Sequence, residues 1–320
     1  MVGSRTWQRL GRRRFWRGSR ILGVPAAVVA LGAGLLTGCQ PAGTNATIEA
    51  TAFSVAPTTA GEAFAVCPSG KRALGGGVVE SGPPNGLVVR ASGPLDETGT
   101  TSQTVDGDVA KQWYASVLNN TSQTVNFKVF AVCSTITTAT IEASEMTVLR
   151  GGRASTSAAC PGDMRALGGG LVQSGSASGL RVLHSGPGPA VGPPETLNDG
   201  GVAKRWLGYL RNTRDQNVVV KVFAICSETV NATIEASDFS VAAGATGEAY
   251  AVCPDNKRVL GGGIVPFGGA DVVTIVTASG PLDESGFTAQ TVDGDTARQW
   301  YAAAKSEDIF TSVRVFGICE

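Results

Sequence analysis

The chain of 320 residues contains 26 basic and 26 acidic side chains, 43 glycines, seven cysteines and one histidine. Charged residues make up only 16 % of it and apolar residues 42 %, which argues against intrinsic disorder, because disorder needs high charge and low hydrophobicity. A single histidine excludes histidine-rich metal sites and disfavours Ser-His-Asp or Cys-His catalysis. The length allows two or three domains.

An export signal is expected at residues 1–38. Seven arginines and no acidic residue accompany an apolar stretch from Ile21 to Leu36. A basic segment, a short apolar segment and small residues before a cleavage point are typical of a secretory signal, not of a membrane-spanning helix. Residues 12–17, with the sequence RRRFWR, also resemble the twin-arginine export motif, so two export routes stay open.

The export signal ends in the sequence LTGC at residues 36–39. This sequence resembles the lipobox of bacterial lipoproteins, in which the cysteine is lipid-modified and becomes the mature N-terminus. The resemblance implies a lipid on Cys39, a tether at 39–45, and attachment to the outer face of the cell membrane, or to the outer membrane of a two-membrane cell. The alternative is an ordinary signal peptide with an incidental cysteine.

Cleavage of the leader changes the charge of the protein. The seven arginines are lost, which leaves 19 basic and 26 acidic side chains and a net charge of −7. An acidic chain with no run of basic residues after Arg20 is a poor ligand for nucleic acid or for anionic lipid. Membrane attachment is therefore expected only through the lipid.

Three copies of one unit fill the rest of the chain. The sequence ATIEA begins at positions 46, 139 and 232, and LGGG begins at positions 74, 167 and 260. Both recur every 93 residues, which predicts tandem structural units. We assign repeat 1 to residues 46–136, repeat 2 to 137–229 and repeat 3 to 230–320.

Each repeat is expected to be all-β. The candidate strands of repeat 1 are rich in Val, Ala, Phe and Thr, and Gly, Pro, Asn and Asp separate them. They are residues 47–55, 62–67, 73–80, 87–92, 112–118 and 125–133. This density of short strands predicts a sandwich-like unit, and the last strand, apolar on both faces, is expected inside its sheet. Three units could pack with pseudo-threefold symmetry or form a short rod.

One tryptophan per repeat is expected to point inward. Trp113 shares a strand face with Ala115 and Val117, and Trp206 and Trp300 occupy the same place in the other repeats. Three consecutive glycines offer a flat backbone surface on which an aromatic ring can lie. We therefore expect Trp113 to pack on Gly75–Gly77. The glycines match no phosphate-binding motif.

Six cysteines remain once Cys39 is lipidated, two in each repeat. Pairing within repeats would give Cys67–Cys133, Cys160–Cys226 and Cys253–Cys319, each stabilising its unit by about 4 kcal/mol. The rival scheme joins neighbouring repeats as Cys133–Cys160, Cys226–Cys253 and Cys67–Cys319. We favour the first scheme, because disulfides persist in exported proteins and every unit then has its own crosslink. The sequence contains no C-x-x-C pair, so the cysteines do not suggest a metal site.

Two acidic loops and a tyrosine recur in repeats 1 and 3 but are altered in repeat 2. The residues are Asp96, Glu97, Asp106, Asp108 and Tyr114 in repeat 1, and Asp283, Glu284, Asp293, Asp295 and Tyr301 in repeat 3. They are solvated turns on the simplest interpretation. The alternatives are a ligand groove with a tyrosine platform and a Ca²⁺ site at Asp106, Asp108, Asp293 and Asp295.

The expected function is non-catalytic. Duplicated shallow loops suit multivalent binding of an envelope polysaccharide or surface protein, or a structural role, with no cofactor except possible Ca²⁺. The alternative is a glycan hydrolase that uses Asp96 and Asp108. Recurring Glu49, Glu142 and Glu235 are expected to face outward or to pair with Arg72, Arg165 and Arg258, and His184 to lie on the surface. The unit resembles modules of secreted bacterial proteins of unknown function, which implies no activity.

Overall fold

The computed structural model describes residues 45–82, 86–175, 179–267 and 274–320. The chain divides into two units, residues 1–40 and 41–320, and all described residues belong to the second. The predicted export signal, the lipobox and Cys39 lie outside the described residues. The rest of this section concerns the three repeats.

Repeat 1 forms the six strands that its sequence predicts. They are β1 (Thr47–Val55), β2 (Ala60–Val66), β3 (Arg72–Glu80), β4 (Leu87–Leu95), β5 (Gln112–Asn119) and β6 (Val125–Ser134). Only β4 extends clearly beyond its prediction, through Gly93 and Pro94. The extension is possible because β4 pairs with its second neighbour, β9, only at Ser92. Pro94 therefore interrupts no hydrogen-bond ladder between β4 and β9.

The other two repeats reproduce this order. Repeat 2 contains β7 (Thr140–Val148), β8 (Arg153–Ala159), β9 (Arg165–Gln173), β10 (Leu180–Gly188), β11 (Arg205–Asn212) and β12 (Val218–Ser227), with the 3-10 turn η1 (Pro194–Thr196). Repeat 3 contains β13 (Thr233–Val241), β14 (Thr246–Val252), β15 (Val259–Pro266), β16 (Thr274–Leu282), β17 (Gln299–Ser306) and β18 (Thr311–Cys319). The described residues are therefore all-β, as predicted.

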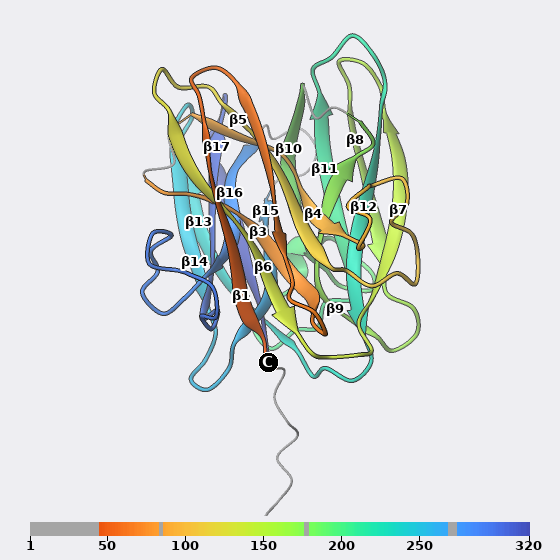
Figure 1. Cartoon of the computed structure of the whole chain (residues 1–320). Coiled ribbons are helices and arrows are strands. Elements are labelled where there is room, and N and C mark those ends of the chain that lie inside the picture. Colours follow the sequence, from red (N-terminus) through yellow and green to blue (C-terminus); the bar gives the residue numbers. More distant parts are fainter. Residues whose placement is uncertain (1–44, 83–85, 176–178, 268–273) are drawn as a thin grey trace, which may run out of the picture. The chain divides into compact units, whose positions relative to one another are not determined.

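Each repeat divides its strands between two sheets and shares both sheets with its neighbours (Figure 1). The three six-stranded sheets of the described residues have the orders β1-β6-β3-β16-β17-β14, β13-β18-β15-β10-β11-β8 and β2-β5-β4-β9-β12-β7. Every sheet thus joins three strands of one repeat to three of another. The arrangement is cyclic, which confirms pseudo-threefold packing and excludes the rod. The last strand of each repeat, such as β6, lies inside its sheet as expected.

The triple glycines allow the three repeats to meet at the centre. A Cβ atom on Gly75 would collide with the backbone of Leu260 and Gly261 from repeat 3. In the same way, Gly168 packs on Leu74 and Gly75, and Gly261 packs on Leu167 and Gly168. Each repeat therefore touches both others, backbone against backbone. Only glycine permits so close an approach.

The tryptophans lie on the second glycine of each triplet, as predicted. A Cβ on Gly76 would lie 2.5 Å from Cδ2 of Trp113. The buried indole N–H of Trp113 donates a hydrogen bond of 2.9 Å to Oγ of Ser92, so its polar atom is satisfied. Trp206 and Trp300 make the same bonds to Ser185 and Ser279. The three rings line one cavity of about 20 Å³, space for about one water molecule.

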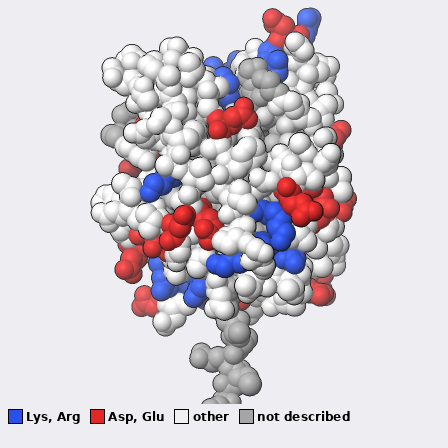
Figure 2. Space-filling view, in the orientation of Figure 1, with Lys and Arg blue, Asp and Glu red and all other residues white. Residues whose placement is uncertain are grey.

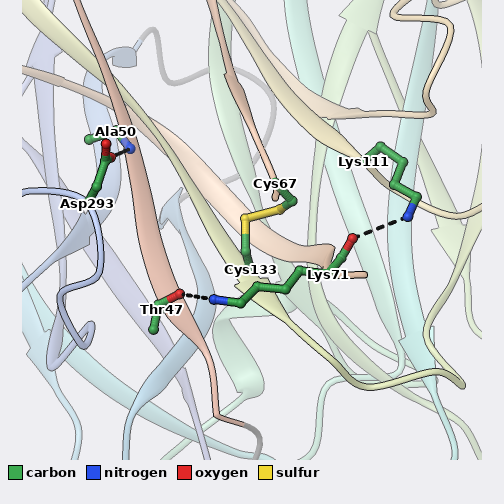
Figure 3. Close-up of a disulfide and its surroundings, with 7 residues drawn as sticks. All are labelled: Thr47, Ala50, Cys67, Lys71, Lys111, Cys133 and Asp293. Carbon is green, nitrogen blue, oxygen red and sulfur yellow. Dashed lines mark hydrogen bonds between the residues drawn. A yellow bond between two sulfur atoms is a disulfide. The ribbon is translucent and has the colours of Figure 1, made fainter. Parts of the chain in front are cut away.

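Disulfides join the two sheets that each repeat enters. Cys67 directly follows β2, and its partner Cys133 lies in β6 of another sheet (Figure 3). The bonds Cys160–Cys226 and Cys253–Cys319 repeat this connection. Pairing within repeats is therefore confirmed. Three disulfides in the described residues also indicate an oxidising, extracytoplasmic environment.

The central packing predicts a sharp difference between two glycines. Gly76→Ala should lower the free energy of unfolding by about 1–3 kcal/mol or more, because the new methyl group meets Trp113 and the carbonyl of Phe130. Gly82→Ala is the matched control, because no atom lies within 4 Å of its Cβ position, and it should change stability little. Chemical denaturation measures both variants. Equal effects would contradict the proposed packing.

Candidate functional site

One aspartate of each acidic loop binds the first strand of the next repeat. Oδ1 of Asp106 accepts a 2.6 Å hydrogen bond from the N–H of Ala143, and Asp293 accepts one of 2.6 Å from Ala50 (Figure 3). Asp199 keeps this contact in repeat 2, at 2.8 Å to Ala236. The contact from repeat 3 to repeat 1 closes the cycle. These aspartates are therefore structural connections between repeats.

A basic residue in the last strand of each repeat holds the same loop. Nζ of Lys128 donates to the carbonyl oxygens of Ala289 and Thr291 in repeat 3. Lys221 makes the equivalent bonds to repeat 1, and Arg314 makes them to repeat 2. The one charged residue of an otherwise apolar strand thus has a structural role. A half-buried cation is stabilised by such acceptors.

The recurring glutamates and arginines also lie at these contacts. Arg72, Arg165 and Arg258 donate to the carbonyl oxygens of Ala139, Ala232 and Ala46, which begin the ATIEA sequence of the next repeat, instead of pairing with the glutamates. The glutamates are half-buried. Burial, followed by the charge of Asp293, raises the pKa of Glu49, and burial followed by the charge of Asp106 raises that of Glu142. The arginines therefore connect one repeat to the next, and the glutamates do not pair with them.

The other predicted loop acids stabilise their own turns. Asp96 accepts hydrogen bonds from the N–H and hydroxyl of Thr98, and Asp108 accepts one from the N–H of Val105. Asp283 and Asp295 do the same in repeat 3. Glu97 and Glu284 are exposed. No group of three or more His, Cys, Asp or Glu residues in the described ranges is placed to hold a metal ion.

The two predicted tyrosines lie in a different setting. Tyr114 and Tyr301 are buried, and their hydroxyl groups donate to carboxylates on the neighbouring edge strand, to Glu62 at 2.5 Å and to Glu248 at 2.6 Å. Burial first, then these hydrogen bonds and charges, raise the pKa of both phenols well above the usual value of 10. Each phenol therefore stays protonated and orients a carboxylate that remains open to solvent.

Tyr114 belongs to a groove of about 250 Å³ between repeats 1 and 2, which we call groove 1–2. Repeat 1 supplies Glu62, the ring of Phe64, which is 38 % exposed, and part of the loop after β4. Repeat 2 supplies Gln173 and its neighbours at the end of β9. The two ring centroids of Phe64 and Tyr114 are 5.1 Å apart. Exposed aromatic surface thus stands beside oxygen acceptors.

Tyr301 belongs to the equivalent groove between repeats 3 and 1, groove 3–1, of about 470 Å³. Here Glu248 and Tyr250 replace Glu62 and Phe64, and Tyr250 is 37 % exposed, with its ring 5.1 Å from Tyr301. Repeat 1 supplies Glu80, and Phe287 adds a second exposed ring at the rim. Two grooves of this kind are thus present among the described residues, but the predicted platform is wrong in one respect: Tyr114 and Tyr301 are buried, and the exposed rings belong to Phe64 and Tyr250.

The junction of repeats 2 and 3 has other residues at these places. By the 93-residue period, Ser155, Ser157 and Leu207 stand where groove 1–2 has Glu62, Phe64 and Tyr114. Pro266 stands where it has Gln173. The acid, the exposed ring and the phenol are all lost together, although the strands are the same. The residues that recur in repeats 1 and 3 but not in repeat 2 therefore include those that form this kind of groove.

Sequence reasoning found the tyrosines and missed the residues around them. The pattern was available, because Glu62-Ala63-Phe64 and Glu248-Ala249-Tyr250 share an acid and an aromatic residue that repeat 2 lacks. The partners Gln173 and Glu80 carried no such pattern. They come from a neighbouring repeat, and only strand order brings them to the site.

One face of the molecule carries few charged side chains. Figure 2 shows one face that is mostly uncharged, with acidic and basic side chains lying beside one another in its lower half.

The described residues include no helix long and apolar enough to cross a membrane. No known protein family matches this chain, and no curated protein matches it either. The grooves must therefore be interpreted from their own chemistry.

The one histidine is not free on the surface as expected. His184 is half-buried beside Tyr209, with ring centroids 5.6 Å apart, and its Nε2 has no hydrogen-bond partner. Burial lowers its pKa from 6.5 to about 4. Between these values the unfolded chain binds a proton that the folded chain does not, so stability falls as the pH decreases.

The lowered pKa of His184 predicts a pH-dependent contribution to the free energy of unfolding, and replacing His184 should remove that contribution. Lowering the pH from 7 towards 4 should cost about 1–3 kcal/mol through His184. His184→Ala, which installs the residue found at the matching Ala91 and Ala278, should lose that component. Denaturation across pH tests it, and an NMR titration of the imidazole measures the pKa directly. An ordinary pKa near 6.5 would contradict the prediction.

Proposed function

We propose that this protein is a lipid-anchored envelope protein that binds glycans, without catalysis, through groove 1–2 and groove 3–1. The observation that carries the proposal is the recurrence of one groove type at two junctions and its loss at the third. The fold needs only the strands and the glycine contacts, which all three junctions share. The acid, the exposed ring and the buried tyrosine go beyond what the fold requires.

The chemistry of the grooves favours a sugar as ligand. An exposed aromatic ring offers a flat apolar face, which suits the C–H face of a pyranose. The carboxylate of Glu62 or Glu248 accepts hydrogen bonds from ligand hydroxyl groups, and such charge-assisted bonds are stronger than neutral ones. The tyrosine hydroxyl fixes that carboxylate in place, so less conformational entropy is lost on binding.

Two linked grooves suit a polymeric ligand. Shallow grooves bind a single sugar unit weakly, but two on one rigid body can engage one polysaccharide or one coated surface. The second engagement is then intramolecular and raises the overall affinity by orders of magnitude. An envelope polysaccharide or a glycosylated surface protein would provide such a repeated ligand.

Membrane attachment forms part of the proposal. The resemblance of residues 36–39 to a lipobox supports a lipid on Cys39, and the disulfides are consistent with export. Few residues separate Cys39 from β1, so repeat 1 would lie close to the membrane surface.

Glycan binding is tested by giving each groove the residues of repeat 2. The variants are Glu62→Ser with Phe64→Ser, and Glu248→Ser with Tyr250→Ser. All four side chains are exposed, so the fold should be kept. Silencing one groove should weaken binding to an immobilised envelope polysaccharide by about 100-fold or more, and silencing both should abolish it.

The control for this experiment is Ser155→Ala at the junction of repeats 2 and 3, which should bind normally. Thermal unfolding of every variant verifies the fold. Unchanged binding by the doubly silenced protein, or no binding of any polysaccharide by the intact one, would refute the proposal.

Hydrolysis is the second candidate function. One observation favours it, because Glu80 and Glu248 both line groove 3–1, and glycosidases use paired carboxylates. The carboxylates of Asp96 and Asp108, the pair that the sequence suggested, bind their own loops instead. Hydrolysis requires release of new reducing ends, abolished by Glu248→Gln, whereas binding alone leaves the bound polysaccharide intact.

The anchor has its own test. Cys39→Ser should prevent lipid attachment, so the protein should leave the membrane fraction and lose incorporation of a labelled fatty acid. Gly38→Ala, which keeps a small residue before the cysteine, should be processed normally. A Cys39→Ser protein that stays membrane-bound and is processed as before would exclude the lipoprotein assignment.

A further inference from the structure

Each groove contains an exposed aromatic ring, an acid and a buried tyrosine, but the two grooves differ at the position that the neighbouring repeat supplies. Groove 1–2 receives Gln173 at the end of β9, and groove 3–1 receives Glu80 at the end of β3. The two residues occupy matching places one period apart. An amide in one groove thus corresponds to a carboxylate in the other.

Gln173 indicates that its position is made to meet a ligand. Its side chain is 3 % exposed and lines groove 1–2. Nε2 donates to the carbonyl oxygen of Gly175 at 3.3 Å, whereas Oε1 has no hydrogen-bond partner. A buried acceptor without a donor costs free energy, and a hydroxyl or amide N–H of a ligand would remove that cost.

Glu80 brings a charge to the matching place. It is 8 % exposed and lines groove 3–1 beside Tyr301 and Glu248. Its charge contributes, after burial and the effects of Glu248 and Tyr250, to the raised pKa of Tyr301. Two carboxylates therefore act on one phenol in this groove, whereas groove 1–2 has only Glu62.

A second substitution increases the charge difference. Arg90, 9 % exposed, interacts electrostatically with Tyr114 of groove 1–2, although Arg90 itself does not line the groove. The equivalent residue near groove 3–1, at the same bulge of its strand, is the neutral Thr277. Among the residues that line the grooves, groove 1–2 therefore has one acid, Glu62, and groove 3–1 has two, Glu80 and Glu248.

We infer that the two grooves select by charge: groove 3–1 binds a sugar unit with a free, positively charged amine, and groove 1–2 binds its uncharged counterpart. This inference rests on the proposed glycan function and names the ligand class. A charged amine can bind both carboxylates of groove 3–1 and lie against the exposed ring of Tyr250, where cation–π attraction adds to ion pairing. Groove 1–2 offers the same amine only the carboxylate of Glu62, because Gln173 is uncharged.

The test uses two probes that differ only at the nitrogen of each sugar unit, a glucosamine tetramer with charged amines and its fully N-acetylated form with neutral amides, titrated calorimetrically at mildly acidic pH. Each groove is examined alone in a protein whose other groove carries the serine substitutions described above. Groove 3–1 should prefer the amine by about tenfold, and high salt should reduce that preference. Groove 1–2 should prefer the acetylated form.

Two reciprocal variants assign the selectivity to one position. Glu80→Gln should abolish the amine preference of groove 3–1 while acetylated binding persists, and Gln173→Glu should increase amine binding in groove 1–2. Because both residues are buried, thermal unfolding accompanies each titration, and the exposed Glu248→Gln gives a second way to remove a carboxylate. The inference is established if either variant of groove 3–1 loses its preference for the amine and Gln173→Glu gains binding of the amine in groove 1–2.

The opposite results separate two failures. If both probes bind groove 3–1 equally, or if the preference survives both Glu80→Gln and Glu248→Gln, charge selection is wrong and glycan binding stands. If neither probe binds either groove and no polysaccharide binds the intact protein, the proposed function fails. The inference then fails with it.

Discussion

The whole arrangement depends on the close contact of three backbones at the centre. Gly75, Gly168 and Gly261 each lie against the backbone of a neighbouring repeat, where any side chain would collide. This contact lets every repeat place strands in two sheets, and the sheets become complete only when three repeats are present. The second glycine of each triplet receives the tryptophan, so one short sequence provides both the contact between repeats and the core within each repeat.

Because the repeats close on one another, most of the conspicuous polar residues have structural roles. Asp106, Asp199 and Asp293 bind the next first strand, and Lys128, Lys221 and Arg314 hold the loops that carry these aspartates. A structural requirement appears in all three copies, since each junction must be closed. The features present in only two copies are therefore the better evidence for binding. The edge-strand acid, its exposed aromatic neighbour and the buried tyrosine satisfy that criterion.

The grooves show how a repeated fold can vary its sites without altering its core. Each groove takes its acid, ring and tyrosine from one repeat and its last residue from the next. A substitution on one repeat thus changes a groove at one junction while the central glycines and tryptophans stay the same. Gln173 and Glu80 differ in this way, with the same strands around them.

The sequence by itself determined the repeat period and the strands, and it favoured the disulfide pairing and the packing of tryptophan on glycine that the structure contains. These features depend on patterns within one unit, where alternation of side chains, turn residues and recurrence along the chain are visible. It also singled out Tyr114 and Tyr301, because they recur in two repeats and not in the third. Only the tertiary structure decided that the loop aspartates hold neighbouring repeats together and that the grooves contain Glu62, Gln173, Glu248 and Glu80. The reason is physical: these residues meet across sheets that two repeats share, and a sequence read along one unit does not reveal which strands of different units will pair.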